Sequence, residues 1–356
     1  MGEALRTGEH NDLTDVAGVA VGHHHKQGLG WMTGTTVVIP PPGTVGSVDV
    51  RGGGPATRET DALAPDTMVQ DVDAICLSGG SAFGLDAAGG VMAHLAEIGR
   101  GFPVGPDAGQ VVPIVPAAAL FDLGTFGSFD LRPDAEFGRR AAAVARTVPV
   151  PQGNVGAGTG ATAGVLKGGV GSASVVSTDG VTVAALVALN PAGSPVDPSS
   201  GRLWAADRLL AGEFEGLHDP SPVEVEAYRE ALLGAGRAPF NTTLVVVATD
   251  AGLTKPECHR LAIAGQDGLA RAIDPIHAYV DGDVVFALAT GDRELPTAAE
   301  SGPPRPAGGR LLSLLGLGAL AADAVSRAVV HATLATETVG THRSYKDMFP
   351  SAFPAN

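Results

Sequence analysis

The sequence contains little cysteine, and its basic residues are in the minority. Only Cys76 and Cys258 occur among 356 residues, and their wide separation matches neither a disulfide framework nor a zinc site, so we expect a reducing, cytoplasmic location. The 38 acidic residues outnumber the 23 basic ones and give a formal net charge of -15. This balance argues against nucleic acid and anionic lipid as partners and favours neutral or cationic ones.

Long hydrophobic runs are absent as well. No stretch of eighteen uninterrupted apolar residues occurs, and the N-terminal residues MGEALRTGEHND lack the apolar run of a secretory signal. We therefore expect neither membrane insertion nor export. No histidine and carboxylate spacing of a metal site is found, so no metal or other cofactor is predicted.

Glycine, in contrast, is abundant. The chain has 50 glycines and 26 prolines, without a collagen period. Because 44% of the residues are hydrophobic and only 17% are charged, the composition is that of a chain that buries a core, and not of a disordered one. We expect the glycines at turns, at tight helix contacts and along sites lined by main chain.

The length allows one large domain or two ordinary ones, and the pattern of apolar runs and turn residues indicates sheets packed under helices, without internal repeats. We expect a single α/β domain over residues 1–356. Strands are predicted at 72–78, 110–115, 172–177, 181–189 and 241–250, and as a hairpin with an Asp-Gly turn at 276–290; helices are predicted at 81–99, 222–236, 254–271 and 318–337. Thr254 and Glu257 form a capping-box pattern at one helix start. The polar Pro/Gly-rich stretch 294–309 is expected to be a mobile loop.

Several motifs favour ordinary structural interpretations. The stretch GAGTGATAGVLKGG (156–169) has only a weak dinucleotide-binding pattern, because no clear strand precedes it and Lys167 is followed by glycine. Its amides and Lys167 could instead line a site. Ser81 follows a predicted strand but does not fulfil G-x-S-x-G, so a tight turn is favoured over a nucleophile. The run 23–25 of three histidines is interpreted as a solvated loop, and His331 as a core or capping residue.

Two interpretations are open for the tripeptide Asn241-Thr242-Thr243. It could be a polar turn that enters a strand, or a junction at which Thr242 attacks the carbonyl of Asn241 and hydrolysis of the resulting ester frees Thr242 as a new N-terminus. A free α-amine has a reference pKa near 8, so it could act as the local base for its own side chain. Such a nucleophile would not require histidine.

The tripeptide Asp281-Gly282-Asp283 is also open to two interpretations. By default it is a hairpin turn. If the strand that carries Thr242 lies beside it, however, the two carboxylates could orient the hydroxyl and hold the ammonium charged.

Six separated segments together resemble one family. They are RGGGPATRETDAL (51–63), AICLSGGSAFGLDAAGGV (74–91), the glycine-rich stretch 156–169, LNPAG (189–193), NTTLVVVATDAGL (241–253) and VDGD (280–283). Over roughly residues 10–340 the chain is similar to the L-aminopeptidase/D-esterase family, the P1 peptidases or peptidase family S58, which includes β-aminopeptidases and the nylon oligomer hydrolase. Its Asn-Thr-Thr junction resembles the threonine-nucleophile branch.

The resemblance implies a four-layer α/β/β/α sandwich of the N-terminal-nucleophile type. It also implies cleavage into a 1–241 α chain and a 242–356 β chain, with Thr242 as the nucleophile, and a homotetramer of αβ units. Asp281 and Asp283 match the acidic pair that supports the nucleophile. Asn190 matches the asparagine that would donate to the oxyanion, an interaction worth roughly 3 to 4 kcal/mol where such donors have been removed.

Further site residues follow from the same resemblance. The family lysine corresponds to Lys167 or to a position two residues earlier, where Val165 stands. Phe121 occupies the position of a family tyrosine and cannot donate its hydrogen bond. Phe121, Gly158 and Gly160 are expected to contact substrate.

We therefore expect an autoprocessed aminopeptidase or amidohydrolase that acts on a small amine-bearing amide, a peptide or an ω-amino oligomer. Three alternatives are open: an acyltransferase of the ornithine acetyltransferase type, a hydrolase with Ser81 as nucleophile, and an uncleaved binding protein. The sequence does not choose among α-, β- and ω-amino acyl substrates or D-amino esters.

Overall fold

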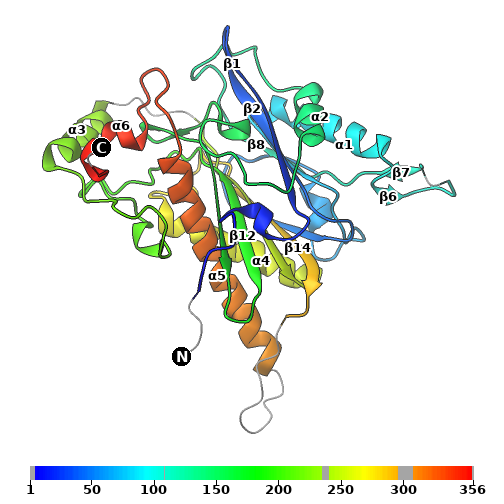
Figure 1. The fold of residues 1–356 in the computed structure, drawn as a ribbon. Coiled ribbons are helices and arrows are strands. Elements are labelled where there is room, and N and C mark those ends of the chain that lie inside the picture. The colour runs from blue at the N-terminus through cyan, green and yellow to red at the C-terminus, as the bar shows by residue number, and fades with distance from the viewer. Residues whose placement is uncertain (1–4, 108, 235–239, 296–307, 355–356) are drawn as a thin grey trace.

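Two five-stranded sheets form the centre of the protein (Figure 1). The computed structural model describes residues 5–107, 109–234, 240–295 and 308–354. The first sheet has the order β1-β2-β5-β8-β4, with bounds Ala20–Gly28, Trp31–Ile39, Ile75–Ser78, Ala117–Ala119 and Ala56–Arg58. The second has the order β11-β12-β13-β14-β3, with bounds Val170–Val176, Thr182–Ala188, Leu244–Ala251, Val284–Arg293 and Val45–Val50.

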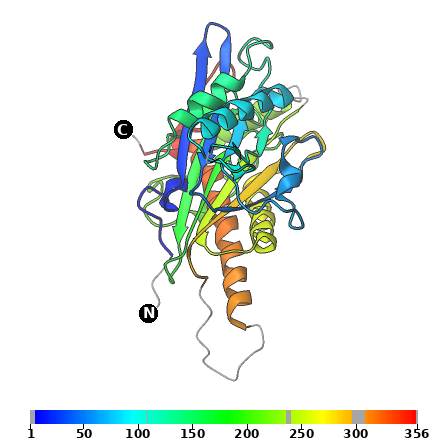
Figure 2. The same cartoon turned by 90° about the vertical axis from the view of Figure 1, so that its right-hand side faces the viewer.

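Helices cover the outer face of each sheet (Figures 1 and 2). The first sheet carries α1 (Ala87–Glu97) and α2 (Ala135–Ala143), which also pack on each other. The second carries α4 (Lys255–Ala272) and α5 (Gly308–Leu334). The predicted four-layer α/β/β/α sandwich is therefore confirmed. Shorter elements are α3 (Pro222–Gly234), α6 (Tyr345–Met348), β6 (Phe102–Pro103), β7 (Val111–Val112), β9 (Thr162–Ala163) and β10 (Leu166–Lys167).

Three hydrophobic cores lie between the four layers. Along β13, Val246 and Ala248 point into the core between the sheets, whereas Val245 and Val247 point into the core under α4 and α5. A strand that buries both faces needs an uninterrupted apolar run, because alternate side chains point to opposite faces. The sequence LVVVA at 244–248 has this property. The third core joins α1 and α2 to the outer face of the first sheet.

Glycines allow these layers to approach each other closely, as predicted. A Cβ on Gly138 of α2 would lie 1.8 Å from the carbonyl oxygen of Ala87 in α1. In the same way, a Cβ on Gly171 of β11 would lie 2.1 Å from the amide nitrogen of Ala332 in α5. No other residue fits at such distances without separating the layers.

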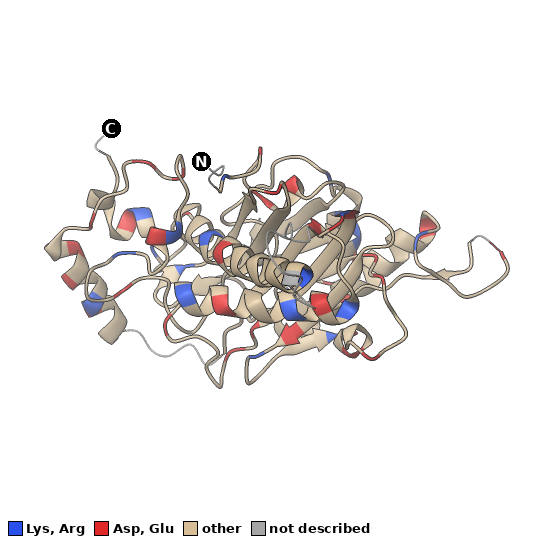
Figure 3. Cartoon of the chain, turned by 90° about the horizontal axis from the view of Figure 1, so that it is seen from below, with Lys and Arg blue, Asp and Glu red and all other residues tan. Residues whose placement is uncertain are grey.

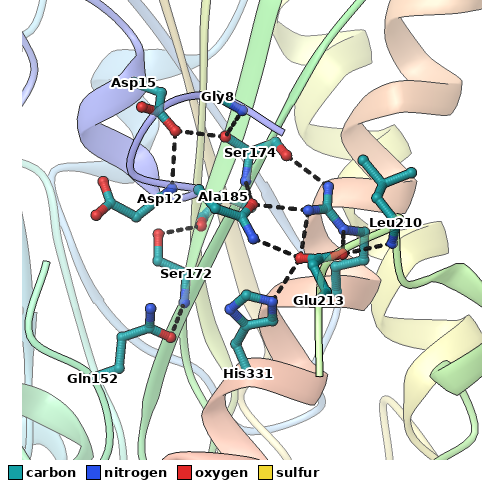
Figure 4. A network of polar contacts seen from close by, with 12 residues as sticks. Gly8, Asp12, Asp15, Gln152, Ser172, Ser174, Ala185, Leu210, Glu213 and His331 are labelled. Atoms are coloured by element: carbon teal, nitrogen blue, oxygen red, sulfur yellow. Dashed lines mark hydrogen bonds and ion pairs between the residues drawn. The ribbon is translucent and has the colours of Figure 1, made fainter. Parts of the chain in front are cut away.

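The buried glutamate Glu213 connects distant parts of the chain (Figure 4). Its carboxylate accepts hydrogen bonds from Arg327 at 2.6 and 2.8 Å, from His331 at 2.8 Å and from Asn11 at 2.6 Å. Arg327 also donates to the carbonyl oxygen of Ser174 in β11 at 2.7 Å. His331 is thus a buried core residue, as expected. The contacts join the N-terminal segment and β11 to α5.

Several predicted elements differ in the structure. The prediction of a hairpin at 276–290 is wrong, because β14 is the only strand in that segment and it pairs in parallel with β13. The histidines at 23–25 lie in β1 and not in a loop. Helix α5 begins ten residues before the predicted start, and the 110–115 strand is reduced to Val111–Val112. Most of the predicted loop 294–309 lies outside the described residues.

Helix α5 is apolar for a structural reason. An 18-residue window within Gly309–Leu334 has a mean hydropathy of 1.5, and by length and composition alone this helix could cross a membrane. However, 56% of the apolar window is buried inside the protein, against β11, β12 and α4. Packing in the core therefore accounts for its composition.

Seen from below, Lys and Arg segments alternate with Asp and Glu segments along the helices (Figure 3).

Candidate active site

The predicted site residues of the second sheet meet at one of its edges because of the strand directions. Strand β12 ends near Asn190 and runs antiparallel to β13, so its end lies beside the start of β13, which Thr242 shortly precedes. Strand β14 runs parallel to β13, so its start, which Asp283 directly precedes, lies at the same edge. Residues 51–54 follow the end of β3 there. The fold thus brings together four segments that are far apart in the sequence.

The Asn241–Thr242 peptide bond is buried and hydrogen-bonded on both sides. Asn241 and Thr242 are only 3% and 4% exposed. The amide of Thr242 donates to the carbonyl oxygen of Asn190 at 2.8 Å, and the amide of Gly282 donates to the carbonyl oxygen of Asn241 at 3.1 Å. The Thr242 hydroxyl itself donates to that carbonyl oxygen. The hydroxyl therefore lies against the carbonyl that self-cleavage would attack.

Asp283 fixes the main chain next to Thr242. One carboxylate oxygen accepts from the amide of Thr243 at 2.7 Å, and the other accepts from Nδ1 and the amide of His277 at 2.9 and 3.2 Å. His277 adopts a φ of 55°, a left-handed conformation that is rare for non-glycine residues. The structure thus uses a sterically unfavourable turn to bring the imidazole to Asp283.

Asp281 is the second buried carboxylate. It accepts from the amides of Ala192 at 3.0 Å and Ala278 at 3.1 Å. Burial and the nearby charge of Asp283 raise its pKa to about 6, against these two hydrogen bonds, which act in the opposite direction. The main chain of Asp281 forms an isolated parallel bridge with Asn241. The Asp-Gly-Asp segment is therefore not a hairpin turn but lies beside the residue that precedes Thr242.

Glycines are required where the 51–54 loop covers the Asp-Gly-Asp segment. A Cβ on Gly52 would lie 2.2 Å from the amide nitrogen of Asp283, and one on Gly282 would lie 2.7 Å from the Thr242 hydroxyl oxygen. The amide of Gly54 donates to the carbonyl oxygen of Asp281 at 2.8 Å. The glycine excess noted in the sequence thus serves the site directly.

Asn190 is held by both ends of its carboxamide. Its oxygen accepts from the amide of Thr162 at 2.8 Å, and its nitrogen donates to the carbonyl oxygen of Phe121 at 3.1 Å. One of the two Nδ2 hydrogens has no further partner in the part of the chain that is described. The carboxamide can therefore donate one hydrogen bond to a substrate.

Lys167 is fully buried and lies next to this arrangement. Its ammonium donates to the carbonyl oxygens of Gly158 at 3.0 Å, Ala161 at 2.9 Å and Gly168. Burial lowers its pKa to about 7, an effect that the charge of Asp122 partly offsets. Ala161 precedes Thr162, which holds Asn190. Within the described residues no hydrogen bond joins Lys167 to Thr242, so Lys167 contacts the site through this loop.

The remaining predicted residues have other surroundings in the intact chain. The ring of Phe121 packs against that of Phe240, with 5.7 Å between the centroids. Gly158 and Gly160 are buried, and a Cβ on Gly160 would lie 2.3 Å from the carbonyl oxygen of Met32. Their contact with substrate stays a prediction. Ser81 forms a tight turn after β5 with a φ of 52°, and no histidine hydrogen bond to its hydroxyl is present in the described part.

Sequence reasoning missed two buried or half-buried polar groups. Asp122 directly follows Phe121 and accepts from the Thr33 hydroxyl at 2.6 Å and the Gly80 amide at 2.7 Å. Burial raises its pKa to about 6. The position of Asp122 within an apolar run was the feature of the sequence that could have revealed it. His277 was hidden because its segment was interpreted as a strand of a hairpin.

Two cavities of about 260 and 330 Å³ lie at the far end of β12, near Val181 and Thr182, and neither is lined by Thr242. No group of three or more His, Cys, Asp or Glu residues that could hold a metal ion occurs in the described ranges. Both cysteines are free and buried.

The fold is Ntn-hydrolase-like. The L-aminopeptidase D-Ala-esterase/amidase of Ochrobactrum anthropi, whose structure is described as a variant of that fold, superposes with a TM-score of 0.65 over 95% of this chain and 91% of its own, at 20% identity. The β-aminopeptidase of a Burkholderia species superposes with a TM-score of 0.68 over 100% and 98%, at 26% identity.

Sequence comparison gives the family. The model of peptidase family S58 matches residues 11–346, and the chain belongs to that family. It is 50% identical to an uncharacterised aminopeptidase of Mycobacterium tuberculosis over 351 residues, which are 96% of this chain and 99% of that protein. It is 31% identical over 340 residues to the 6-aminohexanoate-oligomer endohydrolase of a Kocuria species, covering 92% and 87%. The resemblance found in the sequence is confirmed, and the family supports aminopeptidase or amidohydrolase activity.

Proposed function

We propose that this protein is an autoprocessed amide hydrolase whose nucleophile is Thr242, acting on small amides or peptides that bear a free amine. The observation that carries the proposal is the position of the Thr242 hydroxyl against the carbonyl of Asn241, together with the Gly282 amide that donates to the same carbonyl oxygen. A nucleophile, its target and a hydrogen-bond donor for the developing negative charge are thus assembled in one place.

Self-cleavage would be the first reaction. The Thr242 oxygen attacks the carbonyl carbon of Asn241, and the negative charge that develops on the carbonyl oxygen is stabilised by the Gly282 amide. The C–N bond breaks and the nitrogen of Thr242 takes the hydroxyl proton, which leaves an ester on the Thr242 oxygen. Water hydrolyses this ester to give a carboxyl group at Asn241, the restored hydroxyl and a free amine at Thr242.

Substrate hydrolysis would repeat these steps on an external amide. The free amine of Thr242 accepts the hydroxyl proton while the oxygen attacks the substrate carbonyl, and the proton then passes to the leaving amine. Water, activated by the same amine, hydrolyses the acyl ester. The carbonyl oxygen of Asn190, 2.8 Å from the Thr242 nitrogen, keeps that amine in place.

The surrounding residues would position these groups. The spare Nδ2 hydrogen of Asn190 and the Gly282 amide are two donors for the oxyanion, and removal of one such donor typically costs ~3 to 4 kcal/mol of transition-state stabilisation. Asp283 anchors the main chain at Thr243, and the loop held by Lys167 keeps Asn190 oriented. We further propose a cytoplasmic homotetramer of cleaved αβ units, which light scattering would test as four times the chain mass.

The test is hydrolysis of a panel of aminoacyl amides by the wild type, Thr242→Ala and Thr242→Ser. Thr242→Ala should lose activity on every substrate, because among the described residues only the Thr242 hydroxyl donates to the Asn241 carbonyl oxygen. Thr242→Ser keeps the hydroxyl and should retain activity. Ser81→Ala is the matched control and should act like the wild type. Activity that depends on Ser81 and survives in Thr242→Ala would reject the proposal.

A further inference from the structure

The intact chain already contains an acyl group bound at the nucleophile, namely Asn241. The ester formed in self-cleavage and the ester formed from a substrate both place an acyl carbon on the Thr242 oxygen. Both must be hydrolysed by the same surrounding groups. The residues that surround Asn241 therefore form the acyl subsite, and the shape of Asn241 reports which acyl group fits there. This reasoning rests on the proposed function.

The contacts of Asn241 define that subsite. Its carbonyl oxygen accepts from Gly282, and its side-chain nitrogen donates to the carbonyl oxygen of Pro191 at 3.2 Å. Its backbone amide makes only a long contact of 3.4 Å to the carbonyl oxygen of Val280. Its side-chain oxygen is buried and has no hydrogen-bond partner in the described residues. The subsite thus accepts a donor at the position of Nδ2 but does not satisfy the carboxamide oxygen.

A carboxylate lies beside the same position. Asn241 and Asp281 are partners in a parallel bridge, and side chains of bridge partners point to the same face. The amide of Ala192, which follows Pro191, donates to the Asp281 carboxylate at 3.0 Å. Two amide donors occupy Asp281, and a carboxylate offers about four lone-pair positions, so acceptor capacity is left. The carbonyl of Pro191 and the carboxylate of Asp281 together suit a cation.

The bonds from the scissile carbonyl to Nδ2 define where that cation would be. Three carbons, Cα, Cβ and Cγ, separate the carbonyl carbon of Asn241 from its side-chain nitrogen. A 4-aminobutyryl group has the same spacing between its carbonyl carbon and its amine. It places a donor at Pro191 and a positive charge beside Asp281, and it lacks the carboxamide oxygen that Asn241 leaves unsatisfied.

We propose that the acyl subsite selects amides of short linear amino acids whose amine is on the third carbon beyond the carbonyl, the 4-aminobutyryl class, in preference to their α-amino isomers. An α-amine would lie at the backbone nitrogen of Asn241, where the described residues offer only the long contact to Val280. A 6-aminohexanoyl group would carry its amine two carbons too far to reach Pro191 in an extended conformation.

The experiment compares four benzylamides with the cleaved wild-type protein: 4-aminobutyryl, L-2-aminobutyryl, butyryl and 6-aminohexanoyl. The first two are constitutional isomers, so they differ only in where the amine is attached. Released benzylamine is measured by chromatography, and Thr242→Ala gives the blank. Because the amine forms charge-assisted hydrogen bonds, we expect kcat/KM for 4-aminobutyryl to be about tenfold or more above each of the other three.

The outcomes separate this inference from the proposed function. If 2-aminobutyryl or 6-aminohexanoyl benzylamide reacts as fast as the 4-aminobutyryl compound, or faster, the assignment of the subsite is wrong while Thr242 catalysis stands. Equal rates with butyryl would also overturn it, because no amine would then be recognised. If no compound is hydrolysed and the chain stays intact, the proposed function itself fails, and the inference with it.

Discussion

The amide nitrogen of Gly282 lies 3.1 Å from the carbonyl oxygen of Asn241, on the peptide bond that Thr242 would cleave. This relationship joins two segments 41 residues apart in the sequence, counted from 241 to 282. It exists because β13 and β14 run parallel, so that their preceding segments lie side by side at one edge. Parallel pairing of this kind requires a crossover connection, which α4 provides.

Replacement of Gly282 by alanine should block self-cleavage. The added Cβ would lie 2.7 Å from the Thr242 hydroxyl oxygen and 2.8 Å from the carbonyl oxygen of Gly54, so the segment must shift away from the scissile carbonyl. We expect the rate of chain cleavage to fall by about 100-fold or more, as for loss of an oxyanion donor. Gel electrophoresis of protein sampled after purification measures it.

Gly316→Ala is the matched control for that variant. Gly316 lies within α5 and nothing is within 4 Å of its added Cβ. Alanine is the better helix former by about 1 kcal/mol, so this variant should cleave normally and unfold at a slightly higher temperature. Normal cleavage in Gly282→Ala would show that its amide is not needed at the carbonyl.

The pKa of Asp281 predicts a change in the pH dependence of hydrolysis. The carboxylate becomes protonated as the pH falls through about 6, because burial and Asp283 raise its pKa. The free amine of Thr242, with a reference pKa near 8, must be neutral to act as the base. The logarithm of kcat/KM should therefore fall with a slope of about one per pH unit below pH 8 and about two below pH 6.

Asp281→Asn provides the control for the pH profile. Rates are normalised to the amount of cleaved chain, which mass spectrometry gives for each preparation. Without the carboxylate the slope should stay near one at low pH. A slope of two that persists in Asp281→Asn would assign the second proton to a group other than Asp281.

The buried carboxylate of Glu213 should contribute strongly to stability. Glu213→Gln leaves the guanidinium of Arg327 buried without its counter-charge, and such a loss typically costs ~3 to 5 kcal/mol of unfolding free energy. Urea denaturation at pH 7 measures it. The exposed ion pair of Arg140 and Glu136 is the control, and Glu136→Gln should change stability by less than ~1 kcal/mol.

The contribution of Glu213 to the free energy of unfolding should decrease at acidic pH. Hydrogen bonds from His331 and Arg327 hold the pKa of Glu213 well below its usual range, despite burial, which alone would raise it. A carboxylate whose pKa is lowered by folding contributes stability that is fully present above the pKa of the unfolded chain, near 4.3 for glutamate. That stability is lost as the pH falls below this unfolded-state pKa. The difference between wild type and Glu213→Gln should therefore shrink below about pH 4. A difference that grew on acidification would contradict the assignment.

Much of the fold could be predicted because the decisive signals are local. The uninterrupted apolar run that begins at Leu244 gave a strand buried on both faces, and the capping box of Thr254 and Glu257 gave the start of α4, which the structure has at Lys255. The hairpin at 276–290 could not be judged locally. The first half of this segment pairs with Asn241 at Asp281 and does not fold back on β14. This pairing depends on tertiary contacts and not on the local sequence.

The site was predictable to the extent that its residues belong to family motifs. The structure brings Thr242, Asn190, Asp281 and Asp283 together at one sheet edge, and the catalytic roles that the resemblance implied for them stay predictions. The contributions of main-chain groups were not predictable, because an amide such as that of Gly282 leaves no signature in the sequence. His277 was also missed, since its role depends on a left-handed turn that histidine rarely adopts.

The central claim, that Thr242 is an internal nucleophile which frees itself, is tested most directly by denaturing mass spectrometry of the purified protein. The account predicts two chains, residues 1–241 and 242–356, with threonine at the new N-terminus, and a single intact chain for Thr242→Ala. A wild-type protein that stays one intact chain through prolonged incubation at neutral pH would contradict it and would favour an uncleaved binding protein.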